Sequence, residues 1–521
     1  MPHRILPLLL LAVAIDSPER TDPLTLEWGK EGLKSLRYAG HDWLADGILR
    51  VEGADAGKGA SSVEKGSILR TCSWGRVRGD YSVSGTRLNI VLTVTNRSDK
   101  PIDAVQLSPI QLRLPAKSVE YDEVTPMIAS NVGAPTILPL STSMGRLVVV
   151  NEEIERPLYV GFPWALDRPK STVFPLWVDT ALRNSLPKSY PAVRRPIAPG
   201  DSDTYRLSIR FGPADASRRD LAGDLQQRFR EAAPSTLQWA DRRPIGALVL
   251  ATSDTKWPKN PRGWFMDRNL DASSDDFRRK ALDYADSSAK ILREMGAQGA
   301  VVWDIEGQEF PHAVSYLGDP RLLAELAPEM DPVADEFFKR LRDAGLRTGI
   351  CIRPSRIVKN PGTDPALGKT RYAHFSVDDI GAELSAKIVT AQKRWGCSLF
   401  YIDSNVLPGV NDTNLVPAAL MESLAAKFPG TLLIPEQANA RYWASTAPYR
   451  ELRGGSSSTP EAVREIYPGS FSVVNTADGP IEKRRTELVG AVKRGDVLMF
   501  RAWWNDPANA LVRGILEDAR R

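Results

Sequence analysis

Two acidic residues of this sequence each stand directly after a short apolar run. Asp403 follows Leu399-Phe-Tyr-Ile402, and Glu436 follows Leu432-Leu-Ile-Pro435. Such runs are typical of buried strands, and a carboxylate that ends one is costly to desolvate unless something uses it. Hydrolysis of a glycosidic bond needs two carboxyl groups, one to protonate the leaving oxygen and one to attack carbon or to activate water. The two residues therefore predict a glycosidase, provided that the fold brings them to one cavity.

Asp403 is the candidate nucleophile because it comes directly after its apolar run and so sits on a rigid support. Glu436 is the candidate general acid/base, at the separation of roughly 5 Å that a retaining reaction requires. A structural role stays open for each: Asp403 as a cap of the following loop, and Glu436 as a hydrogen-bonding partner of a sugar hydroxyl. Other acids compete for the proton-donor role: Glu451, Asp478, Asp304 and Glu306.

Further polar and aromatic side chains gather where other apolar runs stop. Arg353 and Arg501 are suited to orient carboxylates, to bind an acidic or hydroxylated substrate, or to form structural ion pairs. The chain has 13 Trp, and a flat apolar ring can stack on a sugar face. The expected substrate-binding residues are Trp303, Asp304, Glu306, Arg353, Asn405, Gln437, Asp478, Arg501 and Trp503.

Strands and helices alternate through residues 244–521, where a catalytic (βα)8 TIM barrel is predicted. Near-continuous apolar strand interiors and about 280 residues are typical of this fold, whose active site lies at the carboxyl ends of the strands. An open doubly wound sheet is the alternative, but it needs a Gly-rich phosphate loop that the sequence lacks. The expected strands are Ile245–Thr252, Gly299–Asp304, Arg347–Arg353, Ser398–Asp403, Thr431–Glu436, Tyr449–Arg453, Ser470–Asn475 and Asp496–Trp503.

The N-terminal part shows a different pattern. Residues 15–213 contain many short alternating runs such as Arg87–Thr95, which predict a large β-sandwich domain. Residues 214–243 predict a helical linker. Residues 1–14 combine a basic start, an apolar run and a small-residue cleavage site, which predicts a signal peptide and a secreted or periplasmic protein.

Composition excludes several classes of function. The 521 residues carry 68 basic and 64 acidic side chains without a long basic block, so no nucleic-acid partner is expected. No stretch after the signal segment is apolar enough to span a membrane. The four His lack metal-ligand spacing, and neither a metal nor another cofactor is expected. The three Cys favour buried free thiols, although a bridge between Cys351 and Cys397 is conceivable.

Several motifs resemble the retaining α-galactosidase and α-glucosidase superfamily of glycoside hydrolases. They are Gly345–Pro354, Val302–Asp304, Leu399–Asn405 and, in the N-terminal part, Gly32–Gly40. The resemblance implies a β-sandwich before the barrel, an α-linked oligo- or polysaccharide substrate, acidic substrate-binding residues after the second strand, and Asp403 as nucleophile. The superfamily usually takes its acid/base Asp from the sixth-strand region, and this chain has no clear Asp there. Its Glu after strand five is more similar to the α-amylase arrangement.

Two other functions remain open at this point. A catalytically silent barrel that only binds glycans would carry the same aromatic and acidic residues. A lyase or isomerase would usually need a metal or a Lys or His base, and no His stands at a predicted strand end. The sequence therefore favours a glycosidase that acts through two carboxyl groups.

Overall fold

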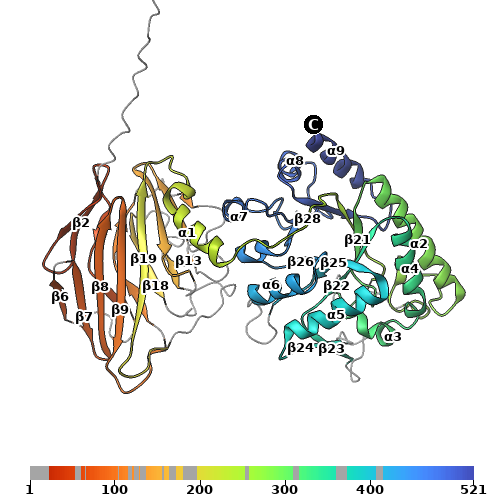
Figure 1. Cartoon of the computed structure of the whole chain (residues 1–521), viewed down its shortest axis with the longest axis horizontal. Helices are drawn as coiled ribbons and strands as arrows, with labels where there is room; N and C mark the ends of the chain where they lie inside the picture. Colours follow the sequence, from red (N-terminus) through yellow and green to blue (C-terminus); the bar gives the residue numbers. More distant parts are fainter. Residues whose placement is uncertain are drawn as a thin grey trace, which may run out of the picture.

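The structure is a computed structural model with two parts, a β-rich half and an α/β half, joined by helix α1 (Figure 1). The predicted signal peptide lies outside the described residues. No helix in the described part of the chain is long and apolar enough to cross a membrane. The described residues are 23–52, 60–64, 66–103, 105–114, 120–121, 128–129, 137–154, 158–162, 172–179, 196–252, 257–308, 316–359, 372–406 and 415–521.

The β-rich half is built on one large antiparallel sheet of order β12-β14-β15-β19-β9-β8-β7-β6. In β9 (Arg87–Asn96) every second residue is buried, as the alternating sequence predicts. The other strands of this sheet are β6 (Ser61–Glu64), β7 (Ser67–Cys72), β8 (Gly75–Ser84), β12 (Glu120–Tyr121), β14 (Ile137–Thr142), β15 (Gly145–Asn151) and β19 (Ser202–Gly212).

Three smaller antiparallel sheets complete this half, and all four sheets share one hydrophobic core. Leu36, Ile90, Leu107 and Leu112, one from each sheet, are fully buried in it. The predicted N-terminal β domain is therefore confirmed. The smaller sheets contain β1 (Thr25–Trp28), β2 (Leu33–Tyr38) and β3 (His41–Asp42); β5 (Arg50–Glu52), β10 (Gln106–Ser108), β13 (Ile128–Ala129), β16 (Tyr159–Gly161) and β18 (Trp177–Asp179); and β4 (Leu44–Asp46), β11 (Gln111–Arg113) and β17 (Val173–Pro175).

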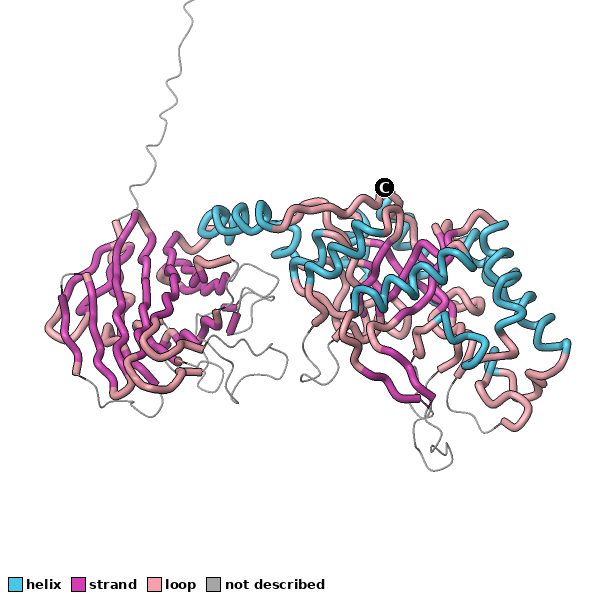
Figure 2. Tube along the Cα trace, turned by 60° about the horizontal axis from the view of Figure 1, so that its bottom comes forward, coloured by secondary structure: helices cyan, strands magenta, loops and turns pink. Residues whose placement is uncertain are grey.

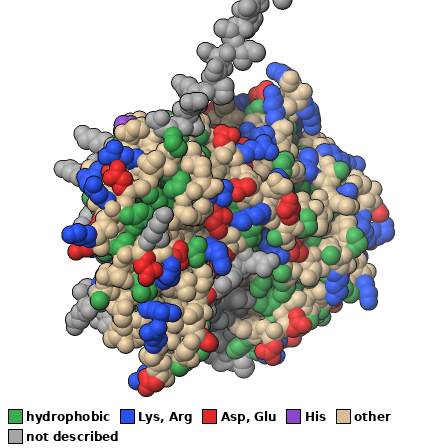
Figure 3. Space-filling model, turned by 60° about the vertical axis from the view of Figure 1, so that its left-hand side comes forward, with side chains coloured by type: hydrophobic (Ala, Val, Ile, Leu, Met, Phe, Trp, Pro, Cys, Tyr) green, Lys and Arg blue, Asp and Glu red, His purple; other side chains and the backbone are tan. Residues whose placement is uncertain are grey.

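Acidic and basic side chains are interspersed on the face shown in Figure 3, and neither sign gathers into one patch there. Many of them pair locally, as Arg78 does with Asp80 and Glu64. Exposed pairs of this kind contribute little to stability, about 0–1 kcal/mol each. The β-rich half is therefore stabilised mainly by its shared core.

The α/β half contains eight parallel strands in the order β26-β25-β22-β21-β20-β29-β28-β27. The two end strands are linked by a hydrogen bond from the Ala447 amide to the Leu433 carbonyl, 3.0 Å long, so the barrel is nearly closed. This cyclic order confirms the predicted barrel, because an open doubly wound sheet reverses its strand order at a switch point. The strands are β20 (Ile245–Leu248), β21 (Gly299–Val302), β22 (Arg347–Ile352), β25 (Cys397–Ile402), β26 (Leu432–Pro435), β27 (Tyr449–Glu451), β28 (Val473–Asn475) and β29 (Val497–Arg501).

Helices cover the outside of the barrel (Figure 2). An unpredicted antiparallel hairpin of β23 (Arg356–Lys359) and β24 (Tyr372–Phe375) is inserted after β22. All three cysteines are free, so no bridge joins Cys351 to Cys397. The helices are α2 (Asp275–Glu294), α3 (Leu323–Leu326), α4 (Asp331–Asp343), α5 (Ile380–Trp395), α6 (Ala418–Lys427), α7 (Glu461–Ile466), α8 (Arg485–Lys493) and α9 (Ala508–Arg520), with short 3-10 turns at Trp264–Met266, Pro320–Leu322 and Ala440–Ala444.

Helix α1 (Arg218–Ala232) contacts both halves. Its N-terminus is capped reciprocally by Ser217 and Asp220. Ala222 and Leu225 pack against the large sheet, and Phe229 packs against a cluster that includes α7 of the barrel half. The helix thus buries side chains on both sides of the junction.

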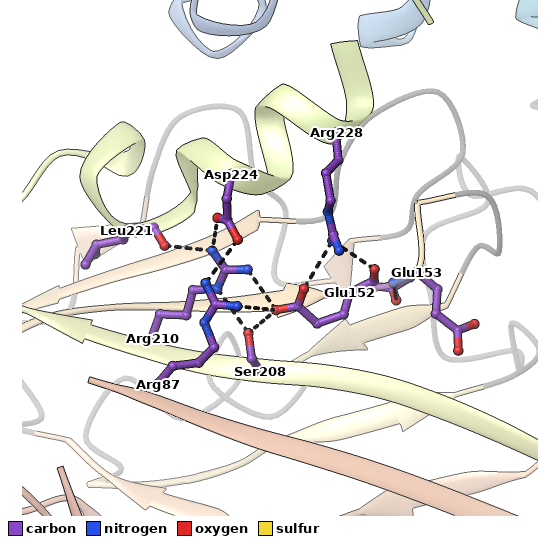
Figure 4. A network of polar contacts seen from close by, with 9 residues as sticks. Arg87, Glu152, Glu153, Ser208, Arg210, Leu221, Asp224 and Arg228 are labelled. Atoms are coloured by element: carbon purple, nitrogen blue, oxygen red, sulfur yellow. Dashed lines mark hydrogen bonds and ion pairs between the residues drawn. The ribbon is translucent and has the colours of Figure 1, made fainter. Parts of the chain in front are cut away.

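A buried arginine of β19 connects the large sheet to α1 (Figure 4). Arg210 is 3% exposed and donates to Glu152 Oε1 at 2.8 Å, to the Leu221 carbonyl at 3.0 Å and to Asp224. Arg228 of α1 reaches the other oxygen of Glu152 at 3.1 Å. Because Arg210 is almost fully desolvated, its loss would leave Glu152 without its main counter-charge.

We expect Arg210→Ala to lower the free energy of unfolding by about 3 kcal/mol, the effect of breaking a buried ion pair. Urea unfolding followed by circular dichroism measures this change. The matched control is Arg206→Ala on the same strand, because Arg206 is 56% exposed in its pair with Glu153. This substitution should lower the free energy of unfolding by less than about 1 kcal/mol. Equal effects of the two substitutions would show that the buried network does not hold α1 to the sheet.

Candidate active site

Asp403 and Glu436 occupy equivalent positions on neighbouring strands. Each lies one residue beyond its strand, and each continues the parallel ladder: the Asp403 amide donates to the Ile352 carbonyl at 2.9 Å, and the Glu436 amide donates to the Ile402 carbonyl at 3.0 Å. In the register of β25 and β26, Ile402 is paired with Pro435, so the two acids follow at the same height. Equivalent residues of parallel strands point to the same face, which brings the two side chains together.

The two carboxyl groups are in contact. Burial, the negative charge of Asp403 and a hydrogen bond between the two acids raise the pKa of Glu436 to about 6. The Ser404 amide donates to Glu436 Oε2 at 2.8 Å, which partly offsets this rise. Ser404 has a φ of +48°, a left-handed conformation that is uncommon for a residue other than glycine. Strain of this kind often accompanies functional sites.

Arg353, at the end of β22, forms an ion pair with Asp403. Its Nε and Nη2 atoms lie 2.6 and 2.5 Å from Asp403 Oδ2, and both residues are buried. A guanidinium favours the ionised form of a neighbouring carboxylate. Arg353 therefore supplies a positive counter-charge on the side of Asp403, while the pKa of Glu436 is the one that is raised.

Asn405 and Gln437 join the two loops that follow these strands. The Asn405 side chain donates to the Gln437 carbonyl and accepts from the Gln437 amide, both at 2.8 Å. Asn405 is fully buried, whereas the Gln437 side chain is exposed. Asn405 therefore fixes the backbone next to Glu436, and of these two residues only Gln437 turns its side chain to solvent.

The carboxyl groups after β21 have different surroundings. Asp304 Oδ1 accepts from the Leu250 amide at 2.7 Å and Oδ2 from the Ala251 amide at 2.9 Å, so both oxygens hold the end of β20 in place. Burial raises the pKa of Asp304 to about 6 despite these hydrogen bonds. Glu306 is 1% exposed, and neither of its carboxyl oxygens has a hydrogen-bond partner in the part of the chain that the structure describes. Burial together with the charge of Asp319 raises its pKa to about 8.

An aromatic cluster lies inside the mouth of the barrel. Trp303 stacks on Tyr401 at 5.4 Å between ring centroids and contacts Tyr316 at 5.2 Å. Among the described residues, the indole N–H of Trp303 and the hydroxyl of Tyr316 are buried without a hydrogen-bond partner. Burial and the charge of Asp304 raise the pKa of Tyr316. Tyr316 is a site residue that the sequence analysis missed.

Three more predicted residues form a separate group after β28 and β29. Arg501 pairs with Asp478 and with Asp506, and its guanidinium lies 5.4 Å from the ring centre of Trp503. The rival acid Glu451, on β27, pairs with Arg453 at 2.7 Å. The structure thus brings Asp403, Glu436 and Arg353 together, while the ion pairs of Asp478 and Glu451 are made with other residues.

Two polar residues around Arg353 were also missed from the sequence. His374 of β24 lies against Arg353 and Ser355, and Lys387 of α5 is fully buried beneath them. Lys387 carried a usable signal, because it stands next to the buried apolar face of its helix at Leu384, Ile388 and Ala391. His374 carried none, since its short strand β24 was not predicted. No group of three His, Cys, Asp or Glu among the described residues is arranged to hold a metal ion.

The chain matches no protein-family model and no curated protein sequence. Among solved structures, an α-N-acetylgalactosaminidase from Bifidobacterium bifidum in complex with GalNAc aligns with a TM-score of 0.54 and 11% identity over 96% of this chain and 92% of that one. A GH36 α-galactosidase from Geobacillus stearothermophilus aligns with a TM-score of 0.41 and 10% identity over 98% of this chain and 76% of that one. The first alignment shows that this chain shares the fold of an α-glycosidase over nearly its whole length.

We expect Glu306→Gln and Asp304→Asn to change stability in opposite directions at pH 8. Folded Glu306 retains its proton up to about pH 8, whereas an unfolded glutamate loses it near its ordinary pKa of 4.5, so stability falls as pH rises through this window. Glu306→Gln removes that loss and should stabilise the protein at pH 8 by on the order of a few kcal/mol. Asp304→Asn leaves one side-chain oxygen for two backbone amides and should lower the free energy of unfolding by about 1–3 kcal/mol.

Thermal unfolding at pH 5 and pH 8 measures both effects. The gain from Glu306→Gln should shrink toward pH 5, where the wild-type side chain is already protonated in the folded state. A lower melting temperature for Glu306→Gln at pH 8 would mean that Glu306 is ionised and paired, contrary to the geometry described above.

Proposed function

We propose that this protein is a retaining glycosidase that cleaves an α-linked sugar, with Asp403 as nucleophile and Glu436 as general acid/base. The observation that carries the proposal is the equivalent position of these two acids, one residue beyond the neighbouring strands β25 and β26. Glycosidic cleavage needs one carboxyl group as proton donor and a second as nucleophile, and the raised pKa of Glu436 suits it to the first role. The α-linkage is supported by the fold shared with an α-N-acetylgalactosaminidase and by the sequence motifs.

The proposed reaction begins with attack by Asp403 on the anomeric carbon. Because Arg353 engages Oδ2, Oδ1 is the oxygen that attacks. Glu436 gives its proton to the glycosidic oxygen as the bond from carbon to that oxygen breaks, and the sugar remains bound covalently to Asp403. Glu436 then takes a proton from water, which attacks the same carbon and releases the sugar.

Buried polar atoms that have no partner among the described residues support a hydroxyl-rich ligand. The Trp303 indole N–H can donate a hydrogen bond, the Glu306 carboxyl can accept or donate one, and the Tyr316 hydroxyl can do both. Each unpaired buried group costs about 1–3 kcal/mol, and a sugar hydroxyl that bonds to it recovers this energy. Tyr316 is suited to this role because its ring contacts Trp303, which stacks on Tyr401, two residues before Asp403.

A second function is favoured by a specific observation. The ion pair with Arg353 neutralises Asp403, and a neutralised carboxylate is a weaker nucleophile. A barrel that binds glycans without cleaving them is therefore the competing proposal. The two proposals differ in whether any α-glycoside is hydrolysed by the wild-type protein.

We expect Asp403→Asn to lower kcat by about 10⁴-fold or more on a nitrophenyl α-glycoside that the wild-type protein cleaves, because an amide cannot form the glycosyl ester. Glu436→Gln should also lower kcat strongly, since it removes the proton donor. Calorimetry with the free sugar should give both variants nearly wild-type affinity. Sugar binding by a wild-type protein that cleaves no α-glycoside would favour the silent barrel.

Two matched substitutions test the choice of acid. Glu451→Gln and Asp478→Asn each remove a rival carboxyl group that is paired with an arginine elsewhere at the mouth. We expect both to change kcat by less than about tenfold. A loss of turnover in either one, with Glu436→Gln still active, would transfer the acid role to that residue.

The pH dependence follows from the pKa of Glu436, which is raised to about 6. The first step needs this group protonated, so kcat/KM should fall about tenfold per pH unit above pH 6. Rate measurements between pH 4.5 and pH 9 check this limb. A decline centred near pH 8 would instead assign the proton to Glu306, whose pKa is raised to about 8.

A further inference from the structure

The hairpin of β23 and β24 brings His374 to the ion pair of the candidate active site. Ile357 and His374 are paired in the hairpin register, and Ile357 is buried in a small cluster with Leu317 and Leu326. This anchored face of the hairpin turns His374 toward Arg353. His374 Nε2 lies 3.0 Å from Arg353 Nη1, and His374 Nδ1 lies 3.0 Å from Ser355 Oγ.

The chemistry of arginine determines the protonation of His374. A guanidinium nitrogen only donates hydrogen bonds, so His374 Nε2 has to accept with its lone pair. The imidazole is then neutral, and its proton lies on Nδ1, from which it is donated to Ser355 Oγ. The hairpin thus supplies an acceptor for Nη1 of Arg353, whereas Nε and Nη2 face Asp403.

A buried lysine fixes the backbone of the same segment. Lys387 Nζ donates to the Arg353 carbonyl at 2.8 Å and to the Ser355 carbonyl at 2.7 Å. Its charge is balanced by Asp319 at 3.6 Å and Glu383 at 3.4 Å. The backbone from Arg353 to Ser355 is therefore held from α5, which leaves the direction of the guanidinium to the contacts of its side chain.

We propose that His374 is a positioning residue, which holds the guanidinium of Arg353 against Asp403 and thereby sets the direction of the attacking carboxylate oxygen. The inference rests on the proposed function, since it assigns His374 a role in that reaction. His374 itself touches Arg353 and Ser355, and it acts on the reacting atoms only through Arg353.

Three substitutions separate this role from packing. His374→Phe keeps a ring of similar size but cannot accept a hydrogen bond, and it should lower kcat about 10–100-fold, as is typical of groups that orient catalytic side chains. KM should change less than about threefold, because sugar contacts remain. His374→Gln retains an acceptor oxygen and should recover much of kcat. His41→Phe, at an exposed histidine of β3 in the other half, is the control and should leave kcat unchanged.

Nuclear magnetic resonance of the full chain labelled with ¹⁵N-histidine gives a readout that does not need activity. The chain has four histidines, so the signals of His374 are identified by their absence from the His374→Gln variant. We expect a neutral ring with its proton on Nδ1. A proton on Nε2, or a charged ring at pH 7.5, would overturn the proposal.

The kinetic outcomes separate this proposal from the proposed function. Wild-type kcat in His374→Phe, with Asp403→Asn inactive, would overturn the positioning role alone. Full turnover in Asp403→Asn would overturn the proposed function and the positioning role that rests on it, while the tautomer measured by resonance would still decide whether the hydrogen bond exists.

Discussion

The contact between Asp403 and Glu436 is the constraint on which the rest of the mouth depends. Two carboxyl groups this close cannot both be ionised at low energy, and the environment decides which of them keeps the proton. Arg353 forms an ion pair with Asp403, whereas burial and the charge of Asp403 raise the pKa of Glu436, so Glu436 is the acid that is suited to carry a proton. The asymmetry arises from a neighbouring strand, β22, and not from the two acids themselves.

The structure surrounds this pair with residues whose polar groups are used for support. Asn405 fixes the loop beside Glu436, Lys387 fixes the backbone of Arg353, and Asp304 holds the end of β20. Next to these satisfied groups lie atoms of Trp303 and Glu306 that have no partner within the described ranges. Buried polar groups are usually paired. The paired groups here therefore mark the residues that support the site, and the unpaired groups mark the surface left for a ligand.

The β-rich half contributes to the site through its attachment to the barrel. Helix α1 packs on the large sheet with Ala222 and Leu225, and it packs with Phe229 against the cluster that contains α7. Tyr467, which follows α7, donates to the Ala233 carbonyl at 2.8 Å. The junction therefore combines apolar burial with directional hydrogen bonds, and it ties the large sheet to the side of the barrel where α7 lies (Figure 1).

The sequence by itself determined the fold and the central pair. The burial of a strand is reflected in its own residue types, so the eight strands were recognised from the sequence. Consecutive strands of a barrel are neighbours, so Asp403 and Glu436 were expected side by side. The same reasoning found Arg353 at the end of the third strand. It could also assign Asn405 and Asp304 to the mouth, because both follow apolar runs.

Only the tertiary structure decided what each of these side chains contacts. The oxygens of Asp304 accept from amides more than 50 residues away, at Leu250 and Ala251, whereas the carboxyl oxygens of Glu306, two residues along the chain, have no hydrogen-bond partner among the residues described. His374 reaches the site through a hairpin with no strong local pattern. Hydrophobic periodicity is a property of each segment alone, so it can be recognised in a sequence. Hydrogen bonds depend on distances and directions that the packing of remote segments sets, so the sequence alone does not reveal them.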